Sequence, residues 1–253
     1  MRQSNGYVIL FTAILTIVVG GVLSFTSQVL APAQKRSVEL DTKSQILSSV
    51  MDRNKLSKMK PNEILSLYDD RISSLVVDIN GEKIETNEDG EPIVAEEVDI
   101  LKNYKKTPEN RMFPVFKYMN AEDTTQVDAY ILPVYGSGLW DKIWGFIALD
   151  RDLETIAGAS FAHKAETPGL GARIATPTVQ NRYVGKKIYN DQGELVSVKM
   201  VKGEGNAGLT EHQVDGMSGA TITGKGLNAM LENYLSYYQA YFEKLKNRVT
   251  AKL

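Results

Sequence analysis

The feature that most limits how this chain can fold is an apolar stretch at its N-terminus. Residues 7–25 read YVILFTAILTIVVGGVLSF, and no residue between Arg2 and Lys35 carries a side-chain charge. A helix needs about 20 apolar residues to cross the hydrocarbon core of a bilayer. The sequence therefore predicts one membrane-spanning helix at about residues 7–30, within an N-terminal segment of residues 1–33.

A cleaved signal peptide is the alternative interpretation of this segment, because Ala31, Pro32 and Ala33 resemble a small-residue cleavage site. The apolar run is longer than the roughly 7–15 residues of a signal peptide's hydrophobic region, and Arg2 is the only basic side chain before it. We therefore expect a retained, single-pass anchor. The flanking basic residues do not fix its orientation, since a large domain can cross the membrane against so small a charge bias.

The composition of the chain excludes several classes of function. The 253 residues carry a net charge of −2, so the basic surface of a nucleic-acid-binding protein is missing and no nucleic-acid partner is expected. No cysteine is present, which excludes thiolate metal ligands, iron–sulfur clusters and cysteine nucleophiles. The only histidines are His163 and His212, too few for a histidine-rich metal site. We predict neither a metal site nor catalytic residues of an acid–base type.

The rest of the chain mixes strand and helix patterns. Apolar and aromatic residues from Leu227 to Leu245 follow helical spacing and predict a long C-terminal helix. Pro61 suits the first turn of an earlier helix. A further short helix is expected just after the span, from the apolar stripe of Ile46, Leu47, Val50 and Met51. Strands are predicted over residues 127–134, 143–149 and 194–202, and a hairpin over 73–86 around Asn80 and Gly81.

These patterns predict the fold class α+β, with one N-terminal transmembrane helix followed by a mixed α+β domain. We expect membrane-proximal helices and strands over residues 34–120. A second domain, which includes the C-terminal helix, is expected over residues 121–253. Residues 34–253 could also form one domain.

The residues with the most chemical information lie where the strand pattern gives way to the C-terminal helix. Residues 215–225 read DGMSGATITGK and combine hydroxyl groups, glycines and the start of a helix. Unpaired backbone N–H groups at a helix N-terminus, together with the helix dipole, favour a phosphate group. The simplest alternative is a Ser or Thr that caps the helix. A Walker A loop is excluded, because Gly226 follows Lys225 where that motif requires a hydroxyl residue.

Three segments of the chain resemble one family. Asp215–Thr221 resembles the flavinylation motif of FMN-binding domains, in which a flavin transferase moves FMN from FAD onto the hydroxyl of the motif's final residue. Residues 166–171 (ETPGLG) resemble the flavin-facing loop of the same family. Residues 133–140 (PVYGSGLW) resemble a segment of the C subunits of sodium-translocating NADH:quinone reductases, whose single span and length also fit this chain. The likeness is weakest over residues 53–110.

The resemblance implies that FMN is bound covalently through its phosphate to Thr221. It further implies that the phosphate lies near Ser218, Gly219, Ala220, Thr223 and the positive charge of Lys225. The ring is expected to meet Thr167 and the backbone from Gly169 to Gly171 at its polar edge, and to pack beside Leu170, Leu139 and Trp140. Two interpretations of Glu166 stay open, as an aid to ring placement or as a solvated loop carboxylate.

The function that the resemblance implies is electron transfer. No G-x-G-x-x-G motif follows a predicted strand, so NADH is expected to react on another subunit of a membrane respiratory complex that exports sodium. The resemblance also implies a flavin transferase as maturation partner and a domain on the outer side of the bacterial cytoplasmic membrane. Two alternatives stay open: the G subunit of the ferredoxin-linked Rnf complex, which shares two of the motifs, and a stand-alone extracytoplasmic flavoprotein.

Overall fold

The computed structural model describes residues 4–87 and 89–250, with side chains described as far as residue 247. It divides into two compact units, Met1–Thr42 and Lys43–Leu253. The predicted finer boundary near residue 120 is not tested by this division and stays a prediction.

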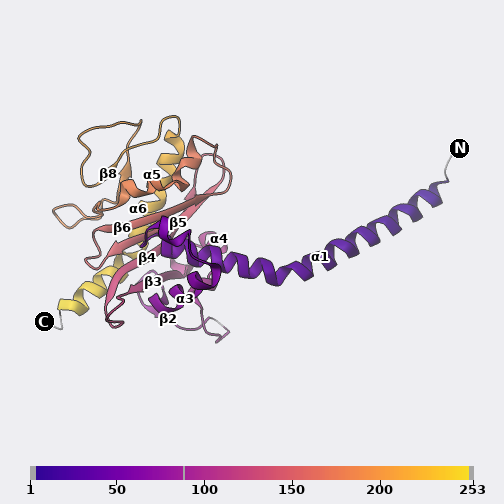
Figure 1. Cartoon of the computed structure of the whole chain (residues 1–253), viewed down its shortest axis with the longest axis horizontal. Helices are drawn as coiled ribbons and strands as arrows, with labels where there is room; N and C mark the ends of the chain where they lie inside the picture. Colours follow the sequence, from indigo (N-terminus) through magenta and orange to yellow (C-terminus); the bar gives the residue numbers. More distant parts are fainter. Residues whose placement is uncertain (1–3, 88, 251–253) are drawn as a thin grey trace. The chain divides into compact units, whose positions relative to one another are not determined.

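The N-terminal apolar stretch lies in one long helix, α1 (Asn5–Ser48) (Figure 1). Among the described residues, α1 is the one helix long and apolar enough to cross a membrane, and its most apolar window has a mean hydropathy of 2.6 with no part buried by the protein. The prediction of a separate short helix after the span is wrong. The helix runs through Pro32 and continues to Ser48, and Ile46 and Leu47 of the predicted stripe are fully buried within the second unit at the end of this same helix.

The second unit is built on a six-stranded antiparallel sheet in the order β2-β1-β3-β4-β5-β6. Its strands are β1 (Ile72–Val77), β2 (Lys83–Ile84), β3 (Phe113–Met119), β4 (Val127–Ser137), β5 (Lys142–Asp150) and β6 (Ile156–His163). The predicted hairpin is confirmed, with the Asp78 carboxylate accepting from the N–H groups of Asn80 and Glu82 and with Gly81 at φ 71°. The fold class is therefore α+β, as predicted.

The predicted strand over residues 194–202 is largely wrong. Only β7 (Lys199–Met200) forms there, and it pairs in parallel with β8 (Gln213–Val214). The alternation fails at Ser197, which has a φ of 57° and a buried side chain where the pattern placed it on the exposed face. The N–H groups of Val196 and Ser197 both donate to the Ile188 carbonyl, so a local loop satisfies this backbone in place of a sheet.

Short helices complete the second unit. They are α2 (Arg53–Leu56), α3 (Pro61–Arg71), α4 (Ile100–Tyr104) and α5 (Pro177–Gln180), with 3-10 turns η1 (Ala95–Glu97), η2 (Pro108–Asn110), η3 (Gly171–Ala175) and η4 (Asn181–Tyr183). The helix expected to open at Pro61 is confirmed as α3.

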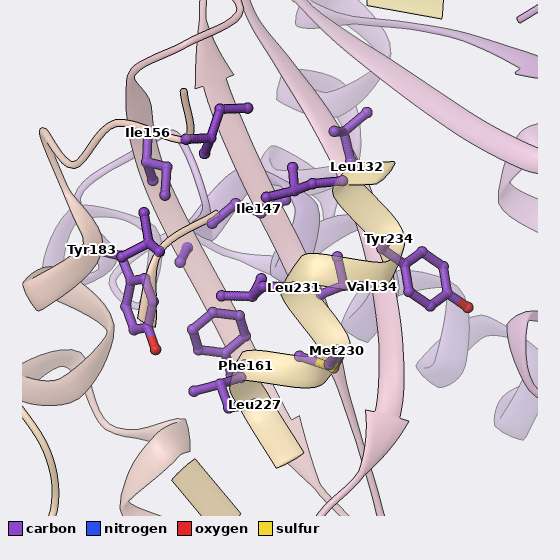
Figure 2. Packing of buried hydrophobic residues seen from close by; sticks show 14 of the residues in the cluster. Leu132, Val134, Ile147, Ile156, Phe161, Tyr183, Leu227, Met230, Leu231 and Tyr234 are labelled. Carbon is purple, nitrogen blue, oxygen red and sulfur yellow. The ribbon is translucent and has the colours of Figure 1, made fainter. Parts of the chain in front are cut away.

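The long C-terminal helix is confirmed as α6 (Thr221–Thr250), which packs along one face of the sheet (Figure 1). Figure 2 shows the apolar side chains of the helix against those of the sheet, with Leu231 near Val134 and Ile147 and with Leu227 beside Phe161. The helix approaches β4 very closely at one end, since a Cβ added to Gly226 would lie 2.2 Å from the Ser137 carbonyl oxygen. This contact fixes the start of α6 against the end of β4, where the candidate site lies.

Candidate cofactor site

The site is built around the junction between the loop of residues 215–220, hereafter the attachment loop, and α6. Gly219 has a φ of 73° and turns the chain into the helix, and the first helical bond runs from the Gly224 N–H to the Ala220 carbonyl at 3.0 Å. In the described part of the chain, the N–H groups of Thr221, Ile222 and Thr223 have no hydrogen-bond partner. Three free donors and the positive end of the helix dipole make this junction suited to an anion.

The structure places the predicted phosphate residues in different environments. Ser218, Gly219 and Lys225 are exposed, and Thr221 is half-buried at the first position of the helix. The side chain of Ala220 is buried, and its N–H donates to Met217. Thr223 faces inward: it is 1% exposed, and its hydroxyl donates to the carboxylate of Glu166 at 2.5 Å. Its side chain is therefore directed into the protein and not toward the exposed start of α6.

Glu166 connects the three motifs that sequence reasoning treated separately. Its side chain is buried, so the interpretation as a solvated loop carboxylate is wrong. One carboxylate oxygen accepts from Thr223 on α6, and the other accepts from the backbone N–H of Trp140 at 3.0 Å. Glycines make room for it, because a Cβ on Gly138 or Gly171 would lie 2.4 or 2.3 Å from these oxygens. A buried carboxylate with two donors thus holds the 138–141 loop, the 166–171 loop and α6 together.

Large apolar side chains are exposed on the segments that Glu166 joins. Such side chains are usually buried, so a group of them on the surface indicates a contact with a ligand or a partner. The exposed fractions are 43% for Leu139, 68% for Trp140, 41% for Leu170 and 57% for Ile222. Sequence reasoning missed Ile222, although an apolar residue directly after Thr221 was a visible signal.

Two contacts fix the positions of these apolar residues. The indole Nε1–H of Trp140 donates to the Thr167 hydroxyl at 3.1 Å, which ties the 138–141 loop to the 166–171 loop. Leu170 lies against the attachment loop, because a Cβ on Gly219 would be 2.8 Å from its Cδ2. Leu170 is therefore held beside the junction that carries Thr221, and Trp140 is held to the loop that carries Leu170. Gly169 has a φ of 76° and is exposed, so its backbone is open to a ligand.

Sequence reasoning also missed a charged cluster that contacts the attachment loop. The carboxylate of Glu204 accepts hydrogen bonds from Arg173 at 2.8 and 2.5 Å and from Arg182 at 2.9 Å. These bonds, first from Arg173 and then from Arg182, hold the pKa of Glu204 well below its usual range. No motif contains these three residues, and only the fold brings them together.

These features fit a flavin mononucleotide. The free N–H groups at the start of α6 suit its phosphate, and the exposed apolar surface suits the faces of a flat aromatic ring. The family model that matches this chain is the FMN-binding domain, over residues 138–236. The chain is thus an FMN-binding-domain protein with an N-terminal apolar helix.

Curated relatives show to which group of FMN-binding-domain proteins this chain is similar. The C subunit of the Na(+)-translocating NADH-quinone reductase of Pseudomonas aeruginosa is 35% identical over 70% of this chain and 71% of the relative. The same subunit of Neisseria meningitidis is 31% identical over 86% of this chain and 85% of the relative. The chain belongs to the family of Na(+)-translocating NADH-quinone reductase C subunits, which confirms the predicted family.

Solved structures agree with this assignment. A crystal structure of the C subunit of the Na(+)-translocating NADH-quinone reductase from Parabacteroides distasonis superimposes with a TM-score of 0.69 at 37% identity, covering 84% of this chain and 96% of that chain. A crystal structure of NqrC from Shewanella oneidensis has a TM-score of 0.68 at 25% identity, covering 85% of this chain and 99% of that chain. The roles of individual site residues stay predictions.

Proposed function

We propose that this chain is an electron-carrying subunit of a sodium-exporting NADH:quinone reductase, with FMN joined by a phosphoester to Thr221. The observation that carries this proposal is the position of Thr221. It is half-buried at the first residue of α6, next to three N–H groups without partners in the described chain. A phosphate joined to this side chain would lie where the helix N-terminus favours negative charge.

The geometry supports different roles for the residues predicted to lie near the phosphate. Ser218 offers an exposed hydroxyl to the phosphate and Gly219 its backbone N–H, while Lys225 adds positive charge in the next turn. Ala220 acts differently, because its N–H is already paired and its methyl group is buried. Thr223 acts through Glu166 and not by direct contact.

The ring of the flavin is assigned to the apolar surface. Leu139, Trp140 and Leu170 offer their exposed side chains to its faces. Thr167 and the backbone from Gly169 to Gly171 offer polar groups to its edge, and Glu166 keeps both loops in place. FMN supplies the redox chemistry, and the protein positions and tunes it. The surface is open, so a neighbouring protein of the complex can approach the ring.

Within the complex, we propose that electrons reach this flavin from one subunit and leave it to another. The chain by itself is then inactive with NADH, and a flavin transferase loads it during maturation. The second unit is proposed to lie on the outer side of the bacterial cytoplasmic membrane. A periplasm-active reporter fused to the C-terminus tests this side: an active fusion supports it, and activity confined to a cytoplasm-dependent reporter contradicts it.

The linkage is tested by producing the chain together with its flavin transferase and measuring intact mass and in-gel flavin fluorescence. Thr221→Ala should carry no flavin, whereas Thr221→Ser keeps the hydroxyl and should be loaded. Neither change should alter the fold, since a substitution at this half-buried position in the first turn of α6 is expected to cost about 1 kcal/mol or less. Flavin that still runs with the Thr221→Ala chain under denaturing conditions would show that the site is wrong.

The electron-carrying role is tested in the assembled complex. Thr221→Ala should block NADH-driven quinone reduction, while NADH oxidation by an artificial acceptor at the entry subunit should continue. Retention of both activities would show that electrons do not pass through this flavin. Isolation of the native chain as a monomer in mild detergent, without membrane partners, would instead favour the stand-alone flavoprotein.

A further inference from the structure

The charged cluster at the attachment loop joins segments that are far apart in the sequence. Arg173 belongs to η3, directly after the 166–171 loop, and Arg182 belongs to η4. Both guanidinium groups converge on Glu204, with N–O distances of 2.5 and 2.9 Å in the two ion pairs. The three side chains are each less than a third exposed, at 27%, 17% and 29% for Arg173, Arg182 and Glu204. Partial shielding of this kind strengthens hydrogen bonds between charged groups.

The same three residues also hold the attachment loop. The Ser218 N–H donates to Glu204 Oε2 at 3.3 Å. Arg182 Nη1 donates to the carbonyl oxygens of Asp215 at 2.9 Å and Gly216 at 2.5 Å. The start of the attachment loop is thus bonded to Arg182, and Ser218 further along it is bonded to Glu204.

Backbone contacts also hold the attachment loop against the segment that carries Glu204. A Cβ on Gly216 would lie 2.0 Å from the Val201 carbonyl oxygen and 2.1 Å from that of Gly203, so the attachment loop rests directly on the segment that carries Glu204. Asp215 reaches back over the same segment and accepts from the N–H groups of Gly205 and Asn206 at 2.9 and 3.0 Å. Rotation of the attachment loop would break all of these contacts together.

We propose that Glu204 is a positioning residue for attachment of the flavin, acting through Ser218, Arg173 and Arg182. In the reaction, the Thr221 hydroxyl oxygen bonds to the phosphorus of the FMN half of FAD. The bond from that phosphorus to the oxygen of the AMP phosphate breaks, AMP leaves, and the hydroxyl proton is released to solvent. A nucleophile displaced by about 1 Å can lose about a hundredfold in rate. Glu204 keeps Thr221 in place relative to the 166–171 loop.

This inference rests on the proposed linkage to Thr221, and the test uses the full apo chain in detergent with purified flavin transferase and FAD. The initial rate of FMN incorporation is followed by in-gel fluorescence, and the loaded residue is identified by peptide mass spectrometry. Glu204→Gln should lower the turnover rate at saturating apo chain roughly tenfold, with little change in KM. The urea midpoint of the apo chain, followed by tryptophan fluorescence, should change little.

Glu211→Gln is the matched control. Glu211 is also a partly exposed carboxylate, paired with Lys187 at 3.1 Å, and among the described residues no hydrogen bond or ion pair links it to the attachment loop. This variant should be loaded at the wild-type rate. The double variant Arg182→Gln, Glu204→Gln should be no slower than the slower single variant, because both residues act through one cluster.

The outcomes separate this inference from the proposed function. If the wild-type chain is loaded at Thr221 and Glu204→Gln is loaded equally fast, the positioning role is refuted while the linkage stands. Equal slowing of Glu204→Gln and Glu211→Gln, or strictly multiplicative losses in the double variant, also refutes it. Loading of the wild-type chain at any other residue overturns both the linkage and the role of Glu204.

Discussion

Two glycines in the first turns of α6 are expected to respond in opposite ways to the same substitution. A Cβ on Gly226 would lie 2.2 Å from the backbone carbonyl oxygen of Ser137 in β4. A Cβ on Gly224 would lie 3.2 Å from the Sδ atom of Met200. The carbonyl belongs to a sheet and cannot yield, whereas a methionine side chain adapts readily to a new neighbour. Gly226→Ala should therefore destabilise the protein, and Gly224→Ala should not.

The magnitudes follow from two opposing terms. Replacing glycine by alanine inside a helix favours the folded state by about 0.8–1.0 kcal/mol. Overpacking costs about 1–3 kcal/mol, and the rigid contact at Gly226 places that site at the upper end of this range. We expect Gly226→Ala to lower the free energy of unfolding by about 1–2 kcal/mol, and Gly224→Ala to raise it by up to about 1 kcal/mol.

Urea unfolding of the full chain in detergent measures both changes. The two tryptophans, Trp140 and Trp144, both belong to the second unit, so intrinsic fluorescence reports its unfolding without interference from the apolar helix. The urea concentrations at the unfolding midpoints of the two variants should move in opposite directions. The slope of the unfolding free energy against urea concentration should stay the same. Shifts of both variants in the same direction would refute the close approach between α6 and β4.

Two further predictions concern charged groups near the site. Thr223→Val removes a donor from the buried carboxylate of Glu166 and should lower the free energy of unfolding by about 1–3 kcal/mol, measured in the same urea assay. Backbone N–H groups of Asn206 and Gly205 lower the pKa of Asp215 from 3.8 to about 2 in the folded protein. Its stabilising contribution is therefore present above pH 3.8 and lost as the pH falls through about 2. Asp215→Asn should make the free energy of unfolding depend less on pH between 3.8 and about 2. Identical acid-unfolding curves for the wild-type and variant chains would contradict the lowered pKa of Asp215.

Sequence patterns predicted the fold best where one periodicity extends over many residues. The helix from Leu227 to Leu245 and the hairpin at Gly81 were both correct, because long-range packing reinforces their local preferences. Residues 194–202 were misassigned because their alternation fits a strand, whereas Ser197 adopts a positive φ and turns inward. A single residue in this conformation reverses which faces are buried, and a hydrophobic pattern does not register it.

The sequence predicted the three motifs of the site separately. It did not predict the contacts that join them. Glu166 looked equally like a solvated carboxylate, because its burial depends on glycines contributed by other segments. Arg173, Arg182 and Glu204 are isolated charges in loops, a pattern typical of a solvated surface. Their roles follow from tertiary structure alone, since each bond in the cluster connects residues that are far apart along the chain.

The position of α6 after every strand of the sheet determines the order in which the protein can mature. Strands β3 to β6 pair with their neighbours in sequence and can form early, but their apolar face stays open until α6 docks on it. Until then the nascent domain exposes a surface that invites aggregation or chaperone binding. Thr221 reaches its place against the 166–171 loop only at that last step. With FMN joined to Thr221 as proposed, cofactor loading would follow completed folding, and a chain truncated before Leu231 should be degraded without carrying fluorescent flavin.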